Sequence, residues 1–326
     1  MSRTTDTEER DVTDVASAGV ADFRRLPVPD AIRWLAEHGE PADPRPDIDT
    51  ASLVRRFPHL AGVEAVDEVV RGPHGPVPVR VYRDAAATPT GSALVWVHGG
   101  AFIGGHLDMP ESNWFSRELA ARGIPVVSVD YAKCLGDVHH PVPSDDVLAG
   151  WEWVRAVAAD RLGVPAAALV LGGASAGGTL TSGAVTRLRD AGEPLPAGLV
   201  LVYPVVHPNG PDASSHVDLD SPHGQLALNF AGSAEALADP QAFAGLGDGH
   251  GFPRTLIVVC ELDDLRPSGE AFAATLAAAG VDSELRLEAG ARHGHIDQPG
   301  DAGALRTIDA VAEWIGRGIR GPEAGA

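Results

Sequence analysis

The chain has 326 residues, with 25 basic and 45 acidic side chains and a formal net charge of −20. This charge repels nucleic acid and anionic membrane surfaces, so we expect neither as a partner. No run of about 18 uninterrupted apolar residues is present, which argues against a transmembrane helix. The polar start "MSRTTDTEERDVTD" lacks the basic and apolar regions of a secretory signal. We therefore expect a soluble, cytoplasmic protein.

Short apolar runs alternate with longer amphipathic runs, as expected when parallel strands are joined by crossover helices. The predicted strands cover residues 63–70, 77–82, 93–98, 125–130, 168–172, 198–203, 255–260 and 283–288. The first two alternate in polarity as edge strands do, and the central ones are apolar on both faces. The predicted helices cover residues 111–122, 145–159, 177–190, 268–279 and 303–317. Ser144 is a plausible N-cap of the second helix, with Asp145 and Asp146 in structural roles in its first turn.

Two segments do not fit this alternation. Residues 1–60 contain the short helical pattern "PDAIRWLAEHG", and residues 205–250 are rich in Gly, Pro, His and Asp. We expect both to form a cap over the strand ends, where inserted segments commonly bind or gate substrate. The prediction is one α/β domain over residues 1–326, with a catalytic core at about 61–204 and 251–320.

The glycine-rich stretch "VLGGASAGGT" at residues 170–179 has two interpretations. It fits the phosphate-binding pattern GxxxxGK[ST] except that Gly178 stands where the lysine is needed, and Lys133 is the chain's only lysine. It also contains GxSxG as Gly173, Ser175 and Gly177, between a predicted strand and a predicted helix. That context favours a sharp turn which exposes Ser175 as a nucleophile.

A second glycine-rich turn, "VWVHGGAFIGG" at residues 95–105, follows another central strand. Acyl transfer needs fixed donors around the developing oxyanion, and backbone N–H groups in such a turn can approach it closely. We assign this role to Gly100 and Ala101, with Gly99 as a further candidate. The N–H of Ala176, directly after the nucleophile, completes the predicted oxyanion hole.

A serine nucleophile needs a histidine base and a carboxylate that orients it. Asp263 follows the strand "TLIVVC" and His293 follows the strand "SELRLE", so both should lie at the carboxyl ends of strands. Glu261 and Asp264 are alternatives for the acid, and His295 shares the loop with His293. Two histidines without a nearby cysteine or spaced carboxylate make a poor zinc site. We expect neither a metal nor a cofactor.

Four motifs in order resemble those of the bacterial hormone-sensitive-lipase-type esterases of the α/β-hydrolase fold. They are "HGGAFIGG" for HGGG, "GASAGG" for GDSAGG, "ELDDLRPSGEAF" for DPLRDEGEAY and "ARHGHID" for M-x-HGF, and the match covers about residues 60–320. The resemblance implies Ser175 as nucleophile, Asp263 as acid and His293 as base. It also implies an eight-stranded, mostly parallel sheet with helices on both faces, a helical cap from the N-terminus, and a homodimer as a frequent assembly.

The chain departs from the family pattern at several places. Ala174 stands where the aspartate of GDSAGG is usual, and His295 replaces the phenylalanine after HG. The family's DYRLAPEHPFP is here "DYAKCLGDVHHPVP", which is longer and lacks the arginine. Residues 205–250 are also poorer in aromatic residues than this cap region usually is. The altered loop affects the prediction of substrate preference more than that of chemistry.

The expected function is hydrolysis of small or medium carboxylic esters through an acyl-enzyme. The alternatives are an acetyl-ester, amide or lactone hydrolase or an acyltransferase or cyclase with the same triad, and a non-catalytic small-molecule-binding protein on the same fold. Cys134 and Cys260 have no C-x-x-C spacing, which predicts reduced thiols. The expected lining of the substrate pocket is Phe23, Leu26, Trp34, Leu35, Phe102 and Phe230.

Overall fold

A computed structural model describes residues 23–208 and 217–318. One eight-stranded sheet has the order β1-β2-β4-β3-β5-β6-β7-β8. The strands are β1 (Val63–Arg71), β2 (Pro76–Asp84), β3 (Ala93–Val97), β4 (Val126–Val129), β5 (Leu169–Ala174), β6 (Gly198–Val202), β7 (Thr255–Leu262) and β8 (Ser283–Arg292). Only β2 runs antiparallel to its neighbours β1 and β4, and the other pairs are parallel. All eight predicted strands and the mostly parallel sheet are confirmed.

The five predicted crossover helices are also confirmed. They are α3 (Asn113–Ala121), α4 (Val142–Val157), α5 (Ala176–Asp190), α7 (Arg266–Ala278) and α8 (Ala302–Arg317). The predicted N-cap role of Ser144 is wrong, because α4 begins at Val142 and Ser144 lies inside its first turn. Asp145 and Asp146 do have structural contacts, since Asp145 pairs with Arg187 and Asp146 accepts a hydrogen bond from the N–H of Ala132.

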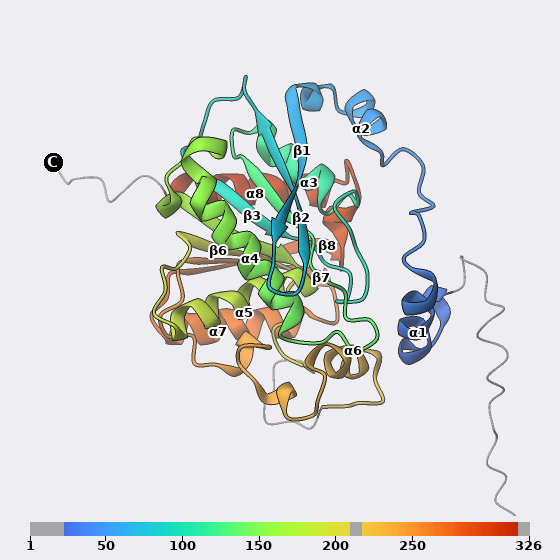
Figure 1. The fold of residues 1–326 in the computed structure, drawn as a ribbon. Helices are drawn as coiled ribbons and strands as arrows, with labels where there is room; N and C mark the ends of the chain where they lie inside the picture. Colours follow the sequence, from blue (N-terminus) through green and yellow to red (C-terminus); the bar gives the residue numbers. More distant parts are fainter. Residues whose placement is uncertain (1–22, 209–216, 319–326) are drawn as a thin grey trace, which may run out of the picture.

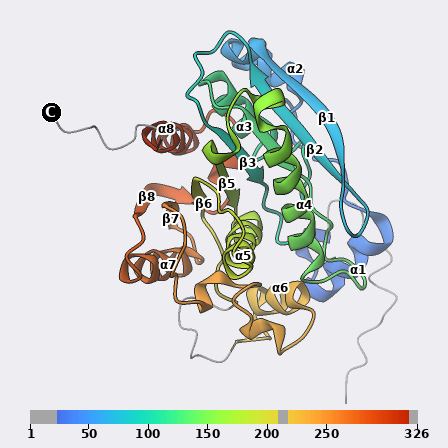
Figure 2. The ribbon, with the colours of Figure 1, turned by 60° about the vertical axis from the view of Figure 1, so that its left-hand side comes forward.

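The sheet separates two apolar clusters. One face packs against α4, α5 and α7 through residues such as Trp151, Leu180 and Phe272. The other packs against α3 and α8 through residues such as Trp114 and Trp314. Figure 2 shows the same layers, with β7 and β8 between α7 and α8. Helices on both faces account for the fully apolar central strands.

The edges of the sheet differ partly from the prediction. β1 is an edge strand, with Val66 and Val69 exposed on it. β2 lies between β1 and β4 and is therefore not an edge, although its burial alternates. Its alternation reflects a position near the rim of the sheet, where one face is only partly covered. β8 forms the opposite edge.

Short elements outside the sheet come from the two predicted cap segments. The first segment contains η2 (Phe23–Arg25), α1 (Val28–His38), α2 (Thr50–Arg56) and η3 (Pro58–Gly62), and the second contains α6 (Pro222–Ala231), η6 (Ala236–Ala238) and η7 (Ala244–Leu246). Residues 1–22 and 209–216 of these segments lie outside the described residues. Helices α1 and α6 contact each other although they are far apart in sequence (Figures 1 and 2).

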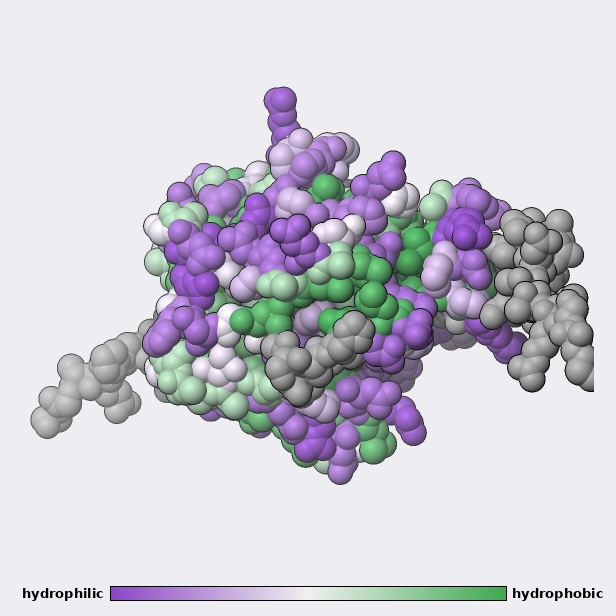
Figure 3. Space-filling model, turned by 90° about the horizontal axis from the view of Figure 1, so that it is seen from below, coloured by the Kyte–Doolittle hydropathy of each residue, from purple (hydrophilic) through white to green (hydrophobic). Residues whose placement is uncertain are grey.

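Seen from the side that carries α6, the molecule gathers apolar surface near the middle of the face, with hydrophilic residues around it (Figure 3). Among the helices of the described residues, none is both long and apolar enough to cross a membrane. Two further short elements, η4 (Ala158–Leu162) and η5 (Ala166–Ala168), lead from α4 to β5, and η8 (His295–Asp297) follows β8. The parallel strands direct their carboxyl ends to one edge, where the predicted site residues meet.

Candidate active site

The turn between β5 and α5 presents Ser175. Ser175 has φ 51° and ψ −120°, a backbone conformation that side-chain-bearing residues rarely adopt. The turn is tight because a Cβ on Gly173 would lie 2.4 Å from Gly177 O, and a Cβ on Gly177 would lie 2.1 Å from Val97 O. Both glycines of the GxSxG motif are therefore required by close backbone approach.

Ala174, where the family usually has an aspartate, is fully buried. It lies in the apolar cluster on the α3 and α8 side of the sheet, together with Trp96 and Val202. A methyl group suits this environment, because an unpaired carboxylate there would be costly to desolvate. With alanine at this position, Ser175 has the positive φ described above.

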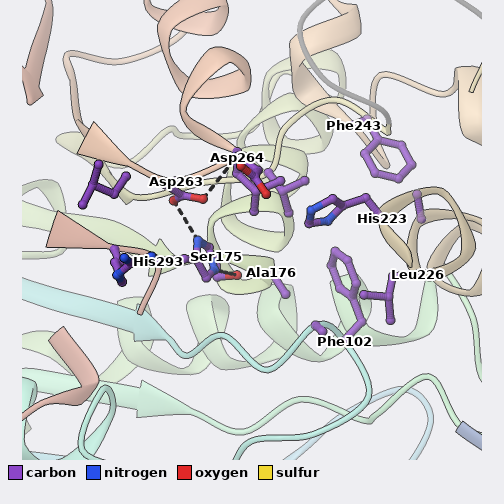
Figure 4. A pocket seen from close by; sticks show the side chains of 15 residues that line it. Phe102, Ser175, Ala176, His223, Leu226, Phe243, Asp263, Asp264 and His293 are labelled. Carbon is purple, nitrogen blue, oxygen red and sulfur yellow. Dashed lines mark hydrogen bonds and ion pairs between the residues drawn. The ribbon is translucent and has the colours of Figure 1, made fainter. Parts of the chain in front are cut away.

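The three predicted triad residues meet at the strand ends (Figure 4). His293 Nε2 lies 2.8 Å from Ser175 Oγ, and His293 Nδ1 lies 2.8 Å from Asp263 Oδ2. The second oxygen of Asp263 accepts a hydrogen bond from the N–H of Leu265 at 2.9 Å. The Asp263 side chain is 4% exposed and that of His293 is 37% exposed, so the base faces a cavity while the acid is shielded.

Burial by itself would raise the pKa of Asp263, but the hydrogen bond and charge of His293 outweigh it and hold the pKa below the ordinary 3.8. An ionised Asp263 can accept a hydrogen bond from a proton on His293 Nδ1, which leaves Nε2 facing Ser175 Oγ. Nε2 is then free to accept the proton of Ser175. The arrangement has the geometry of a Ser-His-Asp triad.

The rival residues have other contacts. Glu261 accepts a hydrogen bond from the N–H of Gly290 at 2.6 Å, and Asp264 lines the cavity without a hydrogen bond to His293. His295 is buried, with Nδ1 3.2 Å from Cys260 Sγ. Among the described residues, no group of three or more His, Cys, Asp or Glu side chains could hold a metal ion.

The turn after β3 lies beside Ser175. Gly100 has φ +114° and no room for a Cβ, and Ala101 and Phe102 also have positive φ values, of 54° and 66°. Within the described residues, the N–H groups of Gly100 and Ala101 donate no hydrogen bond to the protein. The N–H of Ala176 belongs to the first residue of α5, where an amide has no acceptor within the helix.

The candidate role of Gly99 in the oxyanion hole is wrong, because its N–H donates to Glu111 Oε1 at 2.5 Å. Sequence reasoning missed Glu111, and also Tyr203, whose hydroxyl donates to Glu111 Oε2 at 2.5 Å. Neither belongs to a motif that the sequence analysis used. The only advance signal was a polar residue, Glu111, shortly after the glycine-rich turn.

The loop after β4, which departs from the family pattern, contacts the start of the turn after β3. Lys133 Nζ lies 2.6 Å from Asp130 Oδ1 and donates to the carbonyl of Tyr131 at 2.7 Å. Asp130 also lies 3.1 Å from Nε2 of the buried His98, the first residue of the HGG motif. Burial lowers the pKa of Lys133, although Asp130 opposes the shift. The chain's only lysine is thus a structural partner of Asp130.

A cavity of about 470 Å³ opens on the triad (Figure 4). Its lining beyond the triad is largely apolar and includes Ala101, Phe102, Ala176, Val205, His223, Leu226, Ala227, Phe243, Leu262, Leu265 and Arg292. A second cavity of about 540 Å³ lies between α1 and the turn after β3. Ala101 and Leu226 line both cavities.

The expected pocket residues divide between these cavities. Phe102 lines the first, and Phe23, Leu26 and Leu35 line the second. Trp34 and Phe230 line neither, so this part of the prediction is wrong. Both rings are buried one layer behind the wall: Trp34 stacks on Phe23 at 5.2 Å between ring centroids, and Phe230 stacks on Phe102 at 4.2 Å.

The chain is similar in sequence to known proteins. A profile of the alpha/beta hydrolase fold family matches residues 94–297. The ethyl acetate hydrolase of Pseudomonas putida is 29% identical over 73% of this chain and 79% of its own length. The carboxylesterase NlhH of Mycobacterium tuberculosis is 31% identical over 74% of this chain and 76% of its own length.

Solved structures agree with the sequence comparison. A Pyrobaculum calidifontis esterase superposes with a TM-score of 0.68 at 28% identity, covering 84% of this chain and 95% of its own. A bacterial heroin esterase superposes with a TM-score of 0.67 at 26% identity, covering 85% and 95%. The chain therefore belongs to the alpha/beta hydrolase fold family, as its resemblance to the hormone-sensitive-lipase-type esterases predicted, and it is a serine hydrolase that acts on ester bonds.

Proposed function

We propose that Ser175, His293 and Asp263 hydrolyse carboxylic esters through an acyl-enzyme intermediate. The observation that carries the proposal is the pair of 2.8 Å hydrogen bonds that His293 makes, one to Ser175 and one to Asp263. A serine hydroxyl becomes a useful nucleophile when an imidazole can take its proton, and a carboxylate opposite that imidazole stabilises the charge which results.

In the first half-reaction, Ser175 Oγ attacks the ester carbonyl while His293 Nε2 takes the hydroxyl proton. The oxyanion accepts hydrogen bonds from the N–H groups of Gly100, Ala101 and Ala176. His293 then gives its proton to the leaving alcohol as the bond between carbonyl carbon and alcohol oxygen breaks. The product is an ester between the acyl group and Ser175.

In the second half-reaction, a water molecule replaces the alcohol. His293 takes a proton from the water as its oxygen attacks the acyl carbon, and returns a proton to Ser175 Oγ when the tetrahedral intermediate collapses. The carboxylic acid leaves, and all groups return to their starting states. Apart from the ester and the water, every group named in these steps belongs to this chain.

The size and lining of the cavity support small or medium esters as substrates. A volume of about 470 Å³ accommodates a compact acyl or alcohol group, and its apolar wall includes Phe102, Leu226 and Phe243. His223 and Arg292 add polar groups to the lining. Location in the cytoplasm and assembly as a homodimer remain proposals that rest on the sequence.

Hydrolysis of p-nitrophenyl acetate and butyrate by the wild type and by Ser175→Ala tests this function. We expect the variant to lose at least about 10⁴-fold in kcat and to lose labelling by a fluorophosphonate. Product analysis with water and an added alcohol as competing acceptors separates hydrolysis from acyl transfer. Full activity in Ser175→Ala would remove the proposed mechanism.

Ser268→Ala is the matched control. Ser268 is also hydrogen-bonded to a histidine, since its Oγ lies 2.8 Å from His207 Nδ1, but both residues are buried and neither lines the cavity. We expect this variant to keep fluorophosphonate labelling and to keep kcat per labelled site within about threefold of the wild type.

A further inference from the structure

Glu111 is a buried carboxyl group next to the active site that the proposed mechanism does not use. It lies in the turn before α3 and is 3% exposed. Its backbone is fixed on both sides, because its N–H donates to Asp297 Oδ1 at 3.0 Å and its carbonyl accepts from the indole N–H of Trp96 at 3.0 Å. The backbone of Glu111 is therefore held in place, and with it the Cα atom that carries the side chain.

The carboxyl group of Glu111 joins two parts of the active site. Oε1 accepts the N–H of Gly99, in the turn that carries the proposed oxyanion donors, and Oε2 accepts the hydroxyl of Tyr203. Tyr203 follows β6, and its ring centroid lies 4.8 Å from that of His293. The Glu111 side chain thus links the turn after β3, called the oxyanion turn below, to Tyr203, which packs against His293.

The peptide groups on either side of Gly99 Cα are held in place. The N–H is held by Glu111, and the carbonyl accepts the hydroxyl of Tyr131 at 3.0 Å. Gly99 also lies close to the nucleophile, since a Cβ there would be 3.0 Å from Ser175 Cβ and 2.7 Å from Glu111 Oε1. The next N–H in the chain, that of Gly100, shares a peptide group with the restrained carbonyl, so its direction is fixed as well.

We propose that Glu111 is a positioning residue that fixes the oxyanion turn against the nucleophile through the N–H of Gly99. The inference rests on the proposed function and deepens it. Donors held in place before the reaction stabilise the oxyanion more than mobile ones, because no reorganisation is needed in the transition state. Glu111 touches no reacting atom in this scheme and transfers no proton.

The proposal predicts that the length of the side chain at position 111 affects activity more than its charge does. Glutamine has the same length, and its amide can accept from Gly99 with the oxygen and donate to Tyr203 with the nitrogen. Aspartate keeps the carboxyl group but is one methylene shorter, so it cannot make both hydrogen bonds from the same backbone position. If position is what matters, Glu111→Gln is more active than Glu111→Asp.

The test measures kcat for p-nitrophenyl acetate per fluorophosphonate-reactive site, so that unfolded protein does not count. We expect Glu111→Gln to stay within about threefold of the wild type and Glu111→Asp to fall about 10- to 100-fold. KM should change less than about twofold, and affinity for a trifluoromethyl ketone, which forms an oxyanion on Ser175, should fall by the same factor as kcat. Tyr203→Phe should lower kcat about threefold, because it removes one of the two hydrogen bonds.

Glu118 provides the matched control. Its carboxyl group is also buried, and it accepts the indole N–H of Trp114 at 3.1 Å and pairs with Arg122, but it lies on α3 away from both cavities. We expect Glu118→Asp to lower the melting temperature and to keep kcat per reactive site within about twofold. Loss of activity in this variant equal to that in Glu111→Asp would overturn the proposal.

Two other results would also overturn it. One is unchanged kcat per reactive site in both Glu111→Asp and Tyr203→Phe. The other is a Glu111→Asp variant more active than Glu111→Gln, since charge would then matter more than reach. A failure of the proposed function itself looks different, because Ser175→Ala would then keep its activity whatever the Glu111 variants do.

Discussion

Two histidines that lie two residues apart after β8 form similar pairs with different environments. His293 lies 2.8 Å from Ser175 Oγ, and His295 lies 3.2 Å from Cys260 Sγ. The opposite ring nitrogen of His293 faces Asp263, whereas that of His295 lies 2.7 Å from Thr307 Oγ1. The first pair opens on a cavity, while the second is enclosed between the sheet and α8.

The difference shows that a nucleophile and a histidine within hydrogen-bonding distance do not make an active site. Burial raises the pKa of Cys260 to about 12 and lowers that of His295 to about 4, so both groups are neutral near pH 7. Thr307 offers no charge to stabilise an imidazolium. The pair of Ser175 and His293 has both elements that the pair of Cys260 and His295 lacks. These are a carboxylate hydrogen-bonded to the histidine and a cavity that a substrate can enter.

The largest expected effect separates the two histidines directly. His293→Ala should lower kcat for p-nitrophenyl acetate about 10⁴- to 10⁶-fold, because no base remains for Ser175. His295→Gln should keep kcat per reactive site within about threefold, since His295 takes no proton from the substrate or from Ser175. Equal losses in the two variants would break the comparison.

The carboxylate is the next element to remove. Asp263→Asn should lower kcat about 10³- to 10⁴-fold, because the asparagine amide donates to Nδ1 and favours the wrong tautomer of His293. Glu261→Gln is the control, since Glu261 was a rival for the acid and contacts the backbone of Gly290 instead. We expect it to keep kcat within about twofold. A larger loss in Glu261→Gln than in Asp263→Asn would reassign the acid.

The buried histidine should affect stability rather than rate. His295 has a pKa of about 4 in the folded state and an ordinary value of 6.5 when unfolded, so the unfolded chain binds more protons between these values. The contribution of His295 to the free energy of unfolding is fully present above about pH 6.5 and is lost as the pH falls towards about 4. Between pH 7 and pH 5 this loss amounts to about 2 kcal/mol.

Urea unfolding at pH 7 and pH 5 measures this effect. Between the two pH values, the free energy of unfolding of the wild type should fall by about 2 kcal/mol more than that of His295→Gln. Burial also lowers the pKa of His98, His140 and His207, but these residues remain in both proteins and cancel in the difference. An identical pH dependence in wild type and variant would contradict the neutral, buried state of His295.

The smallest expected effect concerns the thiol. Because burial keeps Cys260 protonated, this thiol of the native protein should not react with iodoacetamide at pH 8, while a fluorophosphonate labels Ser175. Cys260→Ala should keep kcat within about twofold. Mass spectrometry of the treated protein, before and after unfolding, measures the alkylation. Rapid alkylation of native Cys260 would show that the pair is open to solvent.

The sequence was sufficient to predict where the three site residues lie along the chain. Ser175 and Asp263 each follow a recognisable apolar strand, and His293 follows β8, a strand of alternating polarity at the edge of the sheet. In a mostly parallel sheet the carboxyl ends of such strands meet, so position along the chain translates into proximity. The glycines around Ser175 also follow from the motif, because their role is backbone approach. These features depend on local pattern and topology, which a sequence displays.

Other features depend on contacts that no local pattern encodes. Gly99 looks like an oxyanion donor until the side chain of Glu111 folds back onto its N–H. Trp34 and Phe230 are apolar and belong to the cap segments, but whether a ring faces a cavity or stands one layer behind it depends on three-dimensional packing. Ala174 is explained only by its burial among apolar neighbours.

The two cavities meet at Ala101 and Leu226. Leu226 belongs to α6, outside the triad and the glycine-rich turns, and nothing in the proposed chemistry depends on its identity. Because Leu226 lines both cavities, a substitution at this position changes the shape of both. A single substitution at Leu226 can thus reshape the space beside Ser175 without touching the residues of the proposed reaction.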